Sequence, residues 1–77
     1  MKWVPVESSA FWAAGYEDNE HSLYLKFRSD EVYRYFDVPV KQYEEFLAAD
    51  SKGRYFRENI LDRFAYERMH ETWRAAG

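Results

Sequence analysis

The chain has 77 residues and no cysteine, so it has room for one small core, and no disulfide can hold that core together. Aromatic residues make up 21% of the chain, with three Trp, seven Tyr and six Phe, and their packing has to supply most of the stability. The net charge of −3 argues against a strongly basic protein that attracts nucleic acid over its whole surface, so any anion site has to be a local patch.

The sequence carries no signal for export or for membrane insertion. The apolar residues that follow Lys2 are interrupted by Glu7, which leaves them too short for a signal-peptide core, and no later stretch is long enough to span a bilayer. The absence of cysteine is compatible with a reducing compartment. We therefore expect a soluble cytoplasmic protein.

Three segments have the pattern of β-strands. The first is expected at about 10–16, and Pro5 ahead of it favours a sheet edge or the start of a strand because proline has no N–H for a ladder. A polar cluster at 17–21 is typical of a hairpin loop. Residues 22–28 alternate in polarity, and after a short turn at Ser29 and Asp30 residues 31–36 form the next strand.

The alternation assigns each residue of the two later strands to one face of the sheet. The face that we expect to be buried carries Leu23, Leu25, Phe27, Tyr33 and Tyr35. The opposite face, called the outer face below, carries the aromatic and basic residues Tyr24, Lys26, Arg28, Arg34 and Phe36.

Two helices are expected after the strands. Asp37 and Pro39 open the first, because proline is tolerated in a first helical turn and Asp just ahead of it can cap that turn. This helix ends near Asp50, and its apolar side has helical spacing: Val40, Tyr43, Phe46 and Leu47. Ser51 is the expected N-cap of a second, short helix that carries Tyr55, Phe56 and Ile60.

The C-terminal segment fits two patterns. Phe64 and Tyr66 alternate as in a strand, whereas Tyr66, Met69 and Trp73 have helical spacing. We expect a short extended piece near 63–66 and then a helix to about 75. The whole chain is thus predicted to be a single α+β domain, a three-stranded antiparallel meander with two or three helices packed on one face, with its core at about 6–68 and a helical tail at 69–77.

The order and spacing of short motifs along the chain resemble the KTSC domain, a family named after the C-terminus of some lysyl-tRNA synthetases. The similarity spans residues 6 to about 68 and centres on a Tyr-x-Tyr motif, matched by Tyr33 and Tyr35. The remaining matches are Val6-Glu7-Ser8-Ser9, Gly15-Tyr16, Leu23 to Phe27, Val32 and Arg34, Val38-Pro39, Tyr43, Leu47 and Ser51-Lys52-Gly53-Arg54-Tyr55-Phe56.

The chain departs from the family pattern at two positions. Asp30 stands where a turn glycine is common, and Arg57 stands where an asparagine is often found. The resemblance implies that the chain has the family's fold and that it could occur as a single-domain bacterial protein. The function of the family is uncharacterised, with RNA binding only suggested for it.

The outer face is the first candidate site. Aromatics that stack on bases, interleaved with cations that meet phosphates, are typical of single-stranded nucleic-acid binders. The alternative is that such side chains simply suit exposed strand positions.

A second candidate is an anion site at the start of the second helix. Free N–H groups there, with the flexible Gly53 and nearby positive charge, are suited to a phosphate. The residues are Ser51, Lys52, Gly53, Arg54 and Arg57. The alternative is an ordinary capped helix start with solvated basic residues.

Other groups give weaker signals. Tyr33 and Tyr35 could stack on a ligand, but we expect them to fill the core. His21 and His70 are far apart and lack metal-ligand spacing, and Ser8 and Ser9 have no recognisable base, so we expect no metal, no cofactor and no enzymatic activity.

The sequence thus favours a non-enzymatic binding module with RNA or another single-stranded nucleic acid as its partner. The alternative is a protein-interaction module or a small homodimer, with Trp3, Trp12 and Trp73 as anchors, because Trp, Tyr and Arg are favoured in protein interfaces.

Overall fold

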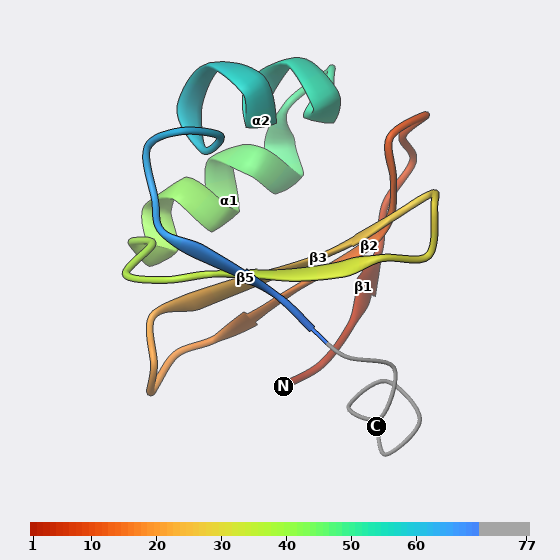
Figure 1. Cartoon of the computed structure of the whole chain (residues 1–77). Helices are drawn as coiled ribbons and strands as arrows, with labels where there is room; N and C mark the ends of the chain where they lie inside the picture. The colour runs from red at the N-terminus through yellow and green to blue at the C-terminus, as the bar shows by residue number, and fades with distance from the viewer. Residues whose placement is uncertain (70–77) are drawn as a thin grey trace.

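A computed structural model of the protein describes residues 1–69. Five strands form one antiparallel sheet in chain order: β1 (Val4–Pro5), β2 (Phe11–Glu17), β3 (Ser22–Phe27), β4 (Val32–Tyr35) and β5 (Tyr66–Arg68). Two helices, α1 (Val40–Ala48) and α2 (Lys52–Asn59), lie together on one face of this sheet (Figure 1). The α+β class and the placement of the helices on one face are confirmed.

The predicted three-stranded meander corresponds to β2, β3 and β4, and the prediction missed both edge strands. β1 has only two residues, with Pro5 opposite Ala13, so it is too short for a recognisable alternation. Pro5 nevertheless lies at a sheet edge, as its missing N–H led us to expect.

The tail prediction was wrong at residues 67 and 68, which lie in β5 where a helix was expected, whereas Tyr66, predicted as the end of a short extended piece, is the first residue of β5. Tyr66 lies opposite Tyr35, and its ring centre is 5.8 Å from that of Tyr35 and 5.6 Å from that of Tyr33. This cross-strand aromatic packing outweighs the helical spacing of the segment. The rest of this predicted helix, which would be the third helix of the chain, falls on residues 70–77, outside the residues that the structure describes.

The first helix begins later than expected, and Asp37 does not cap it. Pro39 is the N-cap residue, with ψ of 145°, and Asp37 is exposed in the left-handed region with φ of 56°. Val38 fixes this segment because its side chain is fully buried, its N–H donates to the carbonyl of His21, and its carbonyl accepts from the Tyr16 hydroxyl. Burial of Val38 therefore sets where the helix starts.

The core lies between the sheet and the two helices. Phe11 is fully buried at its centre and makes ring contacts with Phe27, Phe46 and Phe56. The assignment of the core-facing side chains from alternation is confirmed, because these residues lie in the core or packed against it: Leu23, Leu25, Phe27, Tyr33 and Tyr35.

Candidate functional site

The outer face of the sheet brings Tyr24, Lys26, Arg34 and Phe36 together, but Arg34 is already engaged. Its Nε donates to the buried Ser22 hydroxyl at 3.0 Å, and a terminal nitrogen is 3.0 Å from a Glu20 carboxylate oxygen. Its guanidinium carbon is 4.5 Å from the ring centre of Phe36 and 5.8 Å from that of Tyr24. Arg34 therefore occupies the aromatic surfaces that a base would need.

Tyr24 is only 7% exposed, although it lies on the outer face. Its strand neighbour Gly15 shows why this face is not bare: a Cβ added at Gly15 would be 2.7 Å from the Met1 sulfur and 3.2 Å from the Lys2 carbonyl oxygen. The first residues of the chain thus lie over the sheet at this point. Burial is the main cause that raises the pKa of the Tyr24 hydroxyl.

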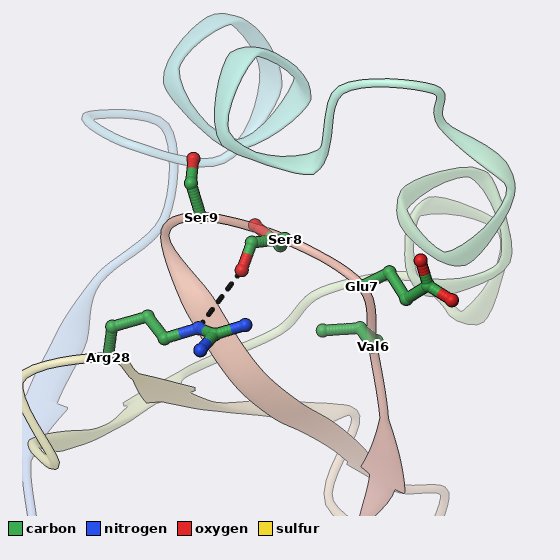
Figure 2. A pocket seen from close by; sticks show the side chains of 5 residues that line it. All are labelled: Val6, Glu7, Ser8, Ser9 and Arg28. Atoms are coloured by element: carbon green, nitrogen blue, oxygen red, sulfur yellow. Dashed lines mark hydrogen bonds between the residues drawn. The ribbon is translucent and has the colours of Figure 1, made fainter.

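Arg28 is separated from the other outer-face residues. Its Nε donates to the backbone carbonyls of Ser8, at 3.0 Å, and Phe11, at 3.3 Å, and its guanidinium carbon is 3.8 Å from the centre of the Trp12 ring. Figure 2 shows the Arg28 side chain reaching across to the backbone of Ser8. The outer-face prediction thus describes two places, one around Arg34 and one around Arg28.

A β-bulge explains why Trp12 is available to Arg28. Phe11 lies opposite Phe27 and Ala13 lies opposite Lys26, so β2 has one residue more than β3 across this interval, and that residue is Trp12. Phe11 is fully buried, whereas the adjacent Trp12 is 46% exposed. Sequence reasoning proposed Trp12 as an anchor but not its pairing with Arg28, because the bulge shifts the register that alternation assumes.

Next to this pair is an open depression of about 640 Å³, called the Arg28 groove below, which is lined by Val6, Glu7, Ser8, Ser9 and Arg28. The loop that forms its wall is ordered by Ser8, whose hydroxyl oxygen accepts from the N–H groups of Ala10 and Phe11. Figure 2 shows the Glu7 carboxylate pointing away from the Arg28 guanidinium. The Arg28 guanidinium is therefore not paired with Glu7, the acidic residue of the groove lining.

At the start of α2, Ser51 caps the helix as predicted, because its hydroxyl accepts from the Arg54 N–H at 3.3 Å. The Lys52 ammonium donates to the Ala49 carbonyl at 3.0 Å, and Arg54 pairs with Glu58 at 3.1 Å. A Cβ on Gly53 would be 3.6 Å from both Ala10 and a terminal nitrogen of Arg57. Two of the three cations proposed for an anion site are thus engaged, Lys52 with the carbonyl that ends α1 and Arg54 with its own helix, and Gly53 lies close to Ala10 in the loop beside the groove.

The tyrosines are part of the core or of its rim. Tyr35 is buried, and burial raises the pKa of its hydroxyl, with smaller contributions from Tyr33 and Tyr66. Sequence reasoning missed a contact between the helices, in which the Tyr55 hydroxyl donates to a Glu45 carboxylate oxygen at 2.7 Å. Burial and this carboxylate raise the pKa of Tyr55 to about 12. No spacing rule links residues on separate helices, so the sequence gave no signal for this pair.

Across residues 1–69, no three His, Asp or Glu side chains lie close enough to hold a metal ion. A helix long and apolar enough to cross a membrane is likewise not found in that part of the chain.

The fold and the groove define a small α+β domain whose meander sheet carries two helices on one face and a Trp–Arg pair at one end. The KTSC domain model matches residues 7–64, and the chain belongs to this family. The family resemblance seen in the sequence is thereby confirmed.

Relatives occur both as small proteins and as parts of larger ones. A protein of Tsukamurella paurometabola is 43% identical over 60 residues, which cover 78% of this chain and 90% of that protein. A lysine–tRNA ligase of Nostoc sp. is 41% identical over 63 residues, which cover 82% of this chain but 11% of the ligase. The crystal structure of a KTSC domain protein from Yersinia pestis has a TM-score of 0.87 and 32% identity, covering 90% of this chain and 97% of that one.

Proposed function

We propose that the chain is a non-catalytic binding module whose partner is a protein, contacted through Trp12, Arg28 and the Arg28 groove. The observation that carries this proposal is the stacking of Arg28 on a Trp12 side chain that is 46% exposed. Trp and Arg are the residue types most enriched among the energetic anchors of protein interfaces. Both side chains are held in place before binding, so little side-chain entropy is lost when a partner docks.

The surroundings of the candidate residues on the outer face favour a protein partner over RNA bound at that face. Arg34 is paired with Glu20 and lies over the Phe36 ring, and Tyr24 is almost fully buried. Single-stranded RNA binding depends on open aromatic rings and free cations. On the outer face, Lys26 is the candidate cation that makes no hydrogen bond or ion pair within residues 1–69.

RNA binding is the second candidate function. The observation in its favour is that the related sequence forms a part of lysine–tRNA ligases, about 11% of the Nostoc ligase. In that reading Lys26, Arg28 and the exposed Arg57 would contact phosphates, and affinity would fall steeply with salt.

The test compares three variants with the wild-type chain: Trp12→Ala, Arg28→Lys and the control Arg54→Ala. Proteins retained by the immobilised wild-type chain are identified, purified and measured for direct binding by calorimetry. Trp12→Ala should weaken the confirmed interaction by about tenfold or more, and Arg54→Ala by less than about twofold. Fluorescence anisotropy with a labelled single-stranded RNA is measured in parallel at low and high salt.

Two outcomes would overturn the protein proposal. One is a purified partner whose affinity is unchanged by Trp12→Ala. The other is salt-dependent RNA binding with no direct protein partner, which would favour the second candidate. A Lys26→Ala, Arg34→Ala variant then tests the outer face alone, because it leaves the stacked Trp12–Arg28 pair in place.

A further inference from the structure

We infer that Arg28 is a carboxylate-binding residue, whose terminal guanidinium nitrogens receive an Asp, Glu or C-terminal carboxylate presented by a protein segment in the Arg28 groove. The inference rests on the proposed function for the source of the carboxylate. It adds the chemistry of the ligand and the residue that would recognise it.

The first argument is that the guanidinium of Arg28 is fixed in orientation. Two backbone carbonyls, those of Ser8 and Phe11, accept from Nε, and the Trp12 ring lies 3.8 Å from the guanidinium carbon. The carbonyls hold one edge of the planar group and the ring holds one face. An arginine restrained in this way loses less conformational freedom on binding than a mobile surface arginine does.

The second argument is that the remaining edge of the group is available. The terminal nitrogens of Arg28 make no hydrogen bond or ion pair within residues 1–69, whereas Arg34, Arg54 and Arg68 each pair with a carboxylate there. Arg28 is exposed and lines the groove. The two terminal nitrogens of a guanidinium match the two oxygens of a carboxylate in a bidentate pair.

The third argument favours one carboxylate over a chain of phosphates. The protein carries a net charge of −3, and Glu7 lines the same groove. A polyanion would meet this negative charge along its length, whereas a single carboxylate needs only the one fork. Val6 and the exposed part of Trp12 offer apolar surface for the residues next to that carboxylate.

The test selects decapeptides from a displayed random library on the wild-type chain and measures the selected peptides by calorimetry. We expect them to share an Asp, a Glu or a free C-terminus. Neutralising that group, by Asp→Asn, Glu→Gln or C-terminal amidation, should weaken binding to the wild-type chain by about tenfold, as for loss of a charge-assisted bidentate pair.

A double-mutant cycle assigns the effect to Arg28. Against Arg28→Lys, which keeps the charge but not the fork, neutralising the peptide carboxylate should cost less than about threefold. Against the control Arg57→Lys, the tenfold loss should persist. Circular dichroism melting checks that each variant is folded, and Arg28→Gln serves as a second variant if Arg28→Lys unfolds.

The outcomes separate this inference from the proposed function. Peptides that need Trp12 but no carboxylate would overturn the inference and leave the proposed function standing. Peptides that are insensitive to both Trp12 and Arg28 would overturn both. Stronger displacement of bound peptide by sodium phosphate than by sodium acetate at equal ionic strength would overturn the choice of a carboxylate.

Discussion

The two faces of the sheet are covered by different kinds of side chain. On the helix-covered face, Phe11, Leu23 and Leu25 are fully buried against α1 and α2. On the outer face, Tyr24 and Ser22 are also buried, but beside the charged Arg34 and the first residues of the chain. Apolar side chains close one face, and a hydrogen-bonded arginine closes the other. Aromatic and basic residues on a strand are therefore not by themselves a sign of an open binding surface.

The largest effect should separate two adjacent residues on opposite sides of β2. Phe11→Ala removes a ring that contacts three other rings in the core and should cost about 3–5 kcal/mol of unfolding free energy. Trp12→Ala removes an exposed ring and should cost less than about 1 kcal/mol. Urea denaturation measures both, and equal losses would contradict the assignment of these residues to different faces.

The next effect tests the polar closure of the outer face. Arg34→Ala removes the Nε donor from the buried Ser22 hydroxyl and the partner of Glu20, and it should cost about 1–2 kcal/mol. Arg54→Ala is the matched control, because its pair with Glu58 is exposed on a single helix and should contribute less than about 0.5 kcal/mol. If the two substitutions cost the same in urea denaturation, Arg34 would not support the outer face.

A smaller effect, measured as the pH dependence of stability, tests the hydrogen bond between Tyr55 and Glu45 that joins the two helices. The pKa of Tyr55 is raised to about 12 in the folded chain, above its ordinary value of 10.0, so the folded state holds this proton more tightly than the unfolded state. Stability is therefore fully present below about pH 10 and falls as the pH rises toward 12.

Tyr55→Phe should lower stability by about 1 kcal/mol at pH 7 and should make the loss above pH 10 less steep than in the wild type. Glu45→Gln is the control that removes the Glu45 carboxylate but keeps the Tyr55 hydroxyl. Urea unfolding at pH 7, 10 and 11 measures this, and parallel pH curves for wild type and Tyr55→Phe would exclude the linkage. Tyr35, whose pKa is also raised, contributes equally to both curves.

The smallest effect concerns the turn that joins β3 to β4. Asp30 has φ of 73°, a left-handed conformation that glycine adopts without strain, and its N–H donates to the Phe27 carbonyl. Asp30→Gly should raise the free energy of unfolding by about 0.5 kcal/mol, whereas Asp30→Ala, which keeps the backbone strain of a positive φ, should lower it. A destabilised glycine variant in thermal unfolding would show that side-chain contacts of Asp30 matter more than its backbone.

How far the sequence predicts this molecule depends on the range of each interaction. Alternation along residues 22–36 depends on neighbours in one strand, and it placed Leu25 and Tyr33 correctly against the helices. Ser51 was also correct as an N-cap, because capping is a contact between residues three positions apart. Both signals are local, so they are readable without the fold.

The failures involve contacts between distant segments. β5 forms because Tyr66 meets Tyr35, 31 positions earlier in the chain, and the late start of α1 follows from Val38, which is buried and whose backbone hydrogen-bonds to Tyr16 and His21. The same limit applies to the candidate site. The sequence grouped Arg28 with Arg34 by parity, whereas backbone carbonyls of the Ser8 loop and the Trp12 ring draw Arg28 to another surface.

Because Trp12 is the extra residue of the β2 bulge, it does not take part in the alternation of inward and outward side chains along the strand. With Trp12 deleted, Phe11 would be followed by Ala13 and Ala14, and the sequence would still alternate as a regular strand opposite Phe27, Lys26 and Leu25. The core would keep its side chains while the exposed ring disappeared. A domain with such an extra residue can gain, lose or exchange the exposed side chain at this position, and with it part of the proposed contact surface, without rebuilding its core.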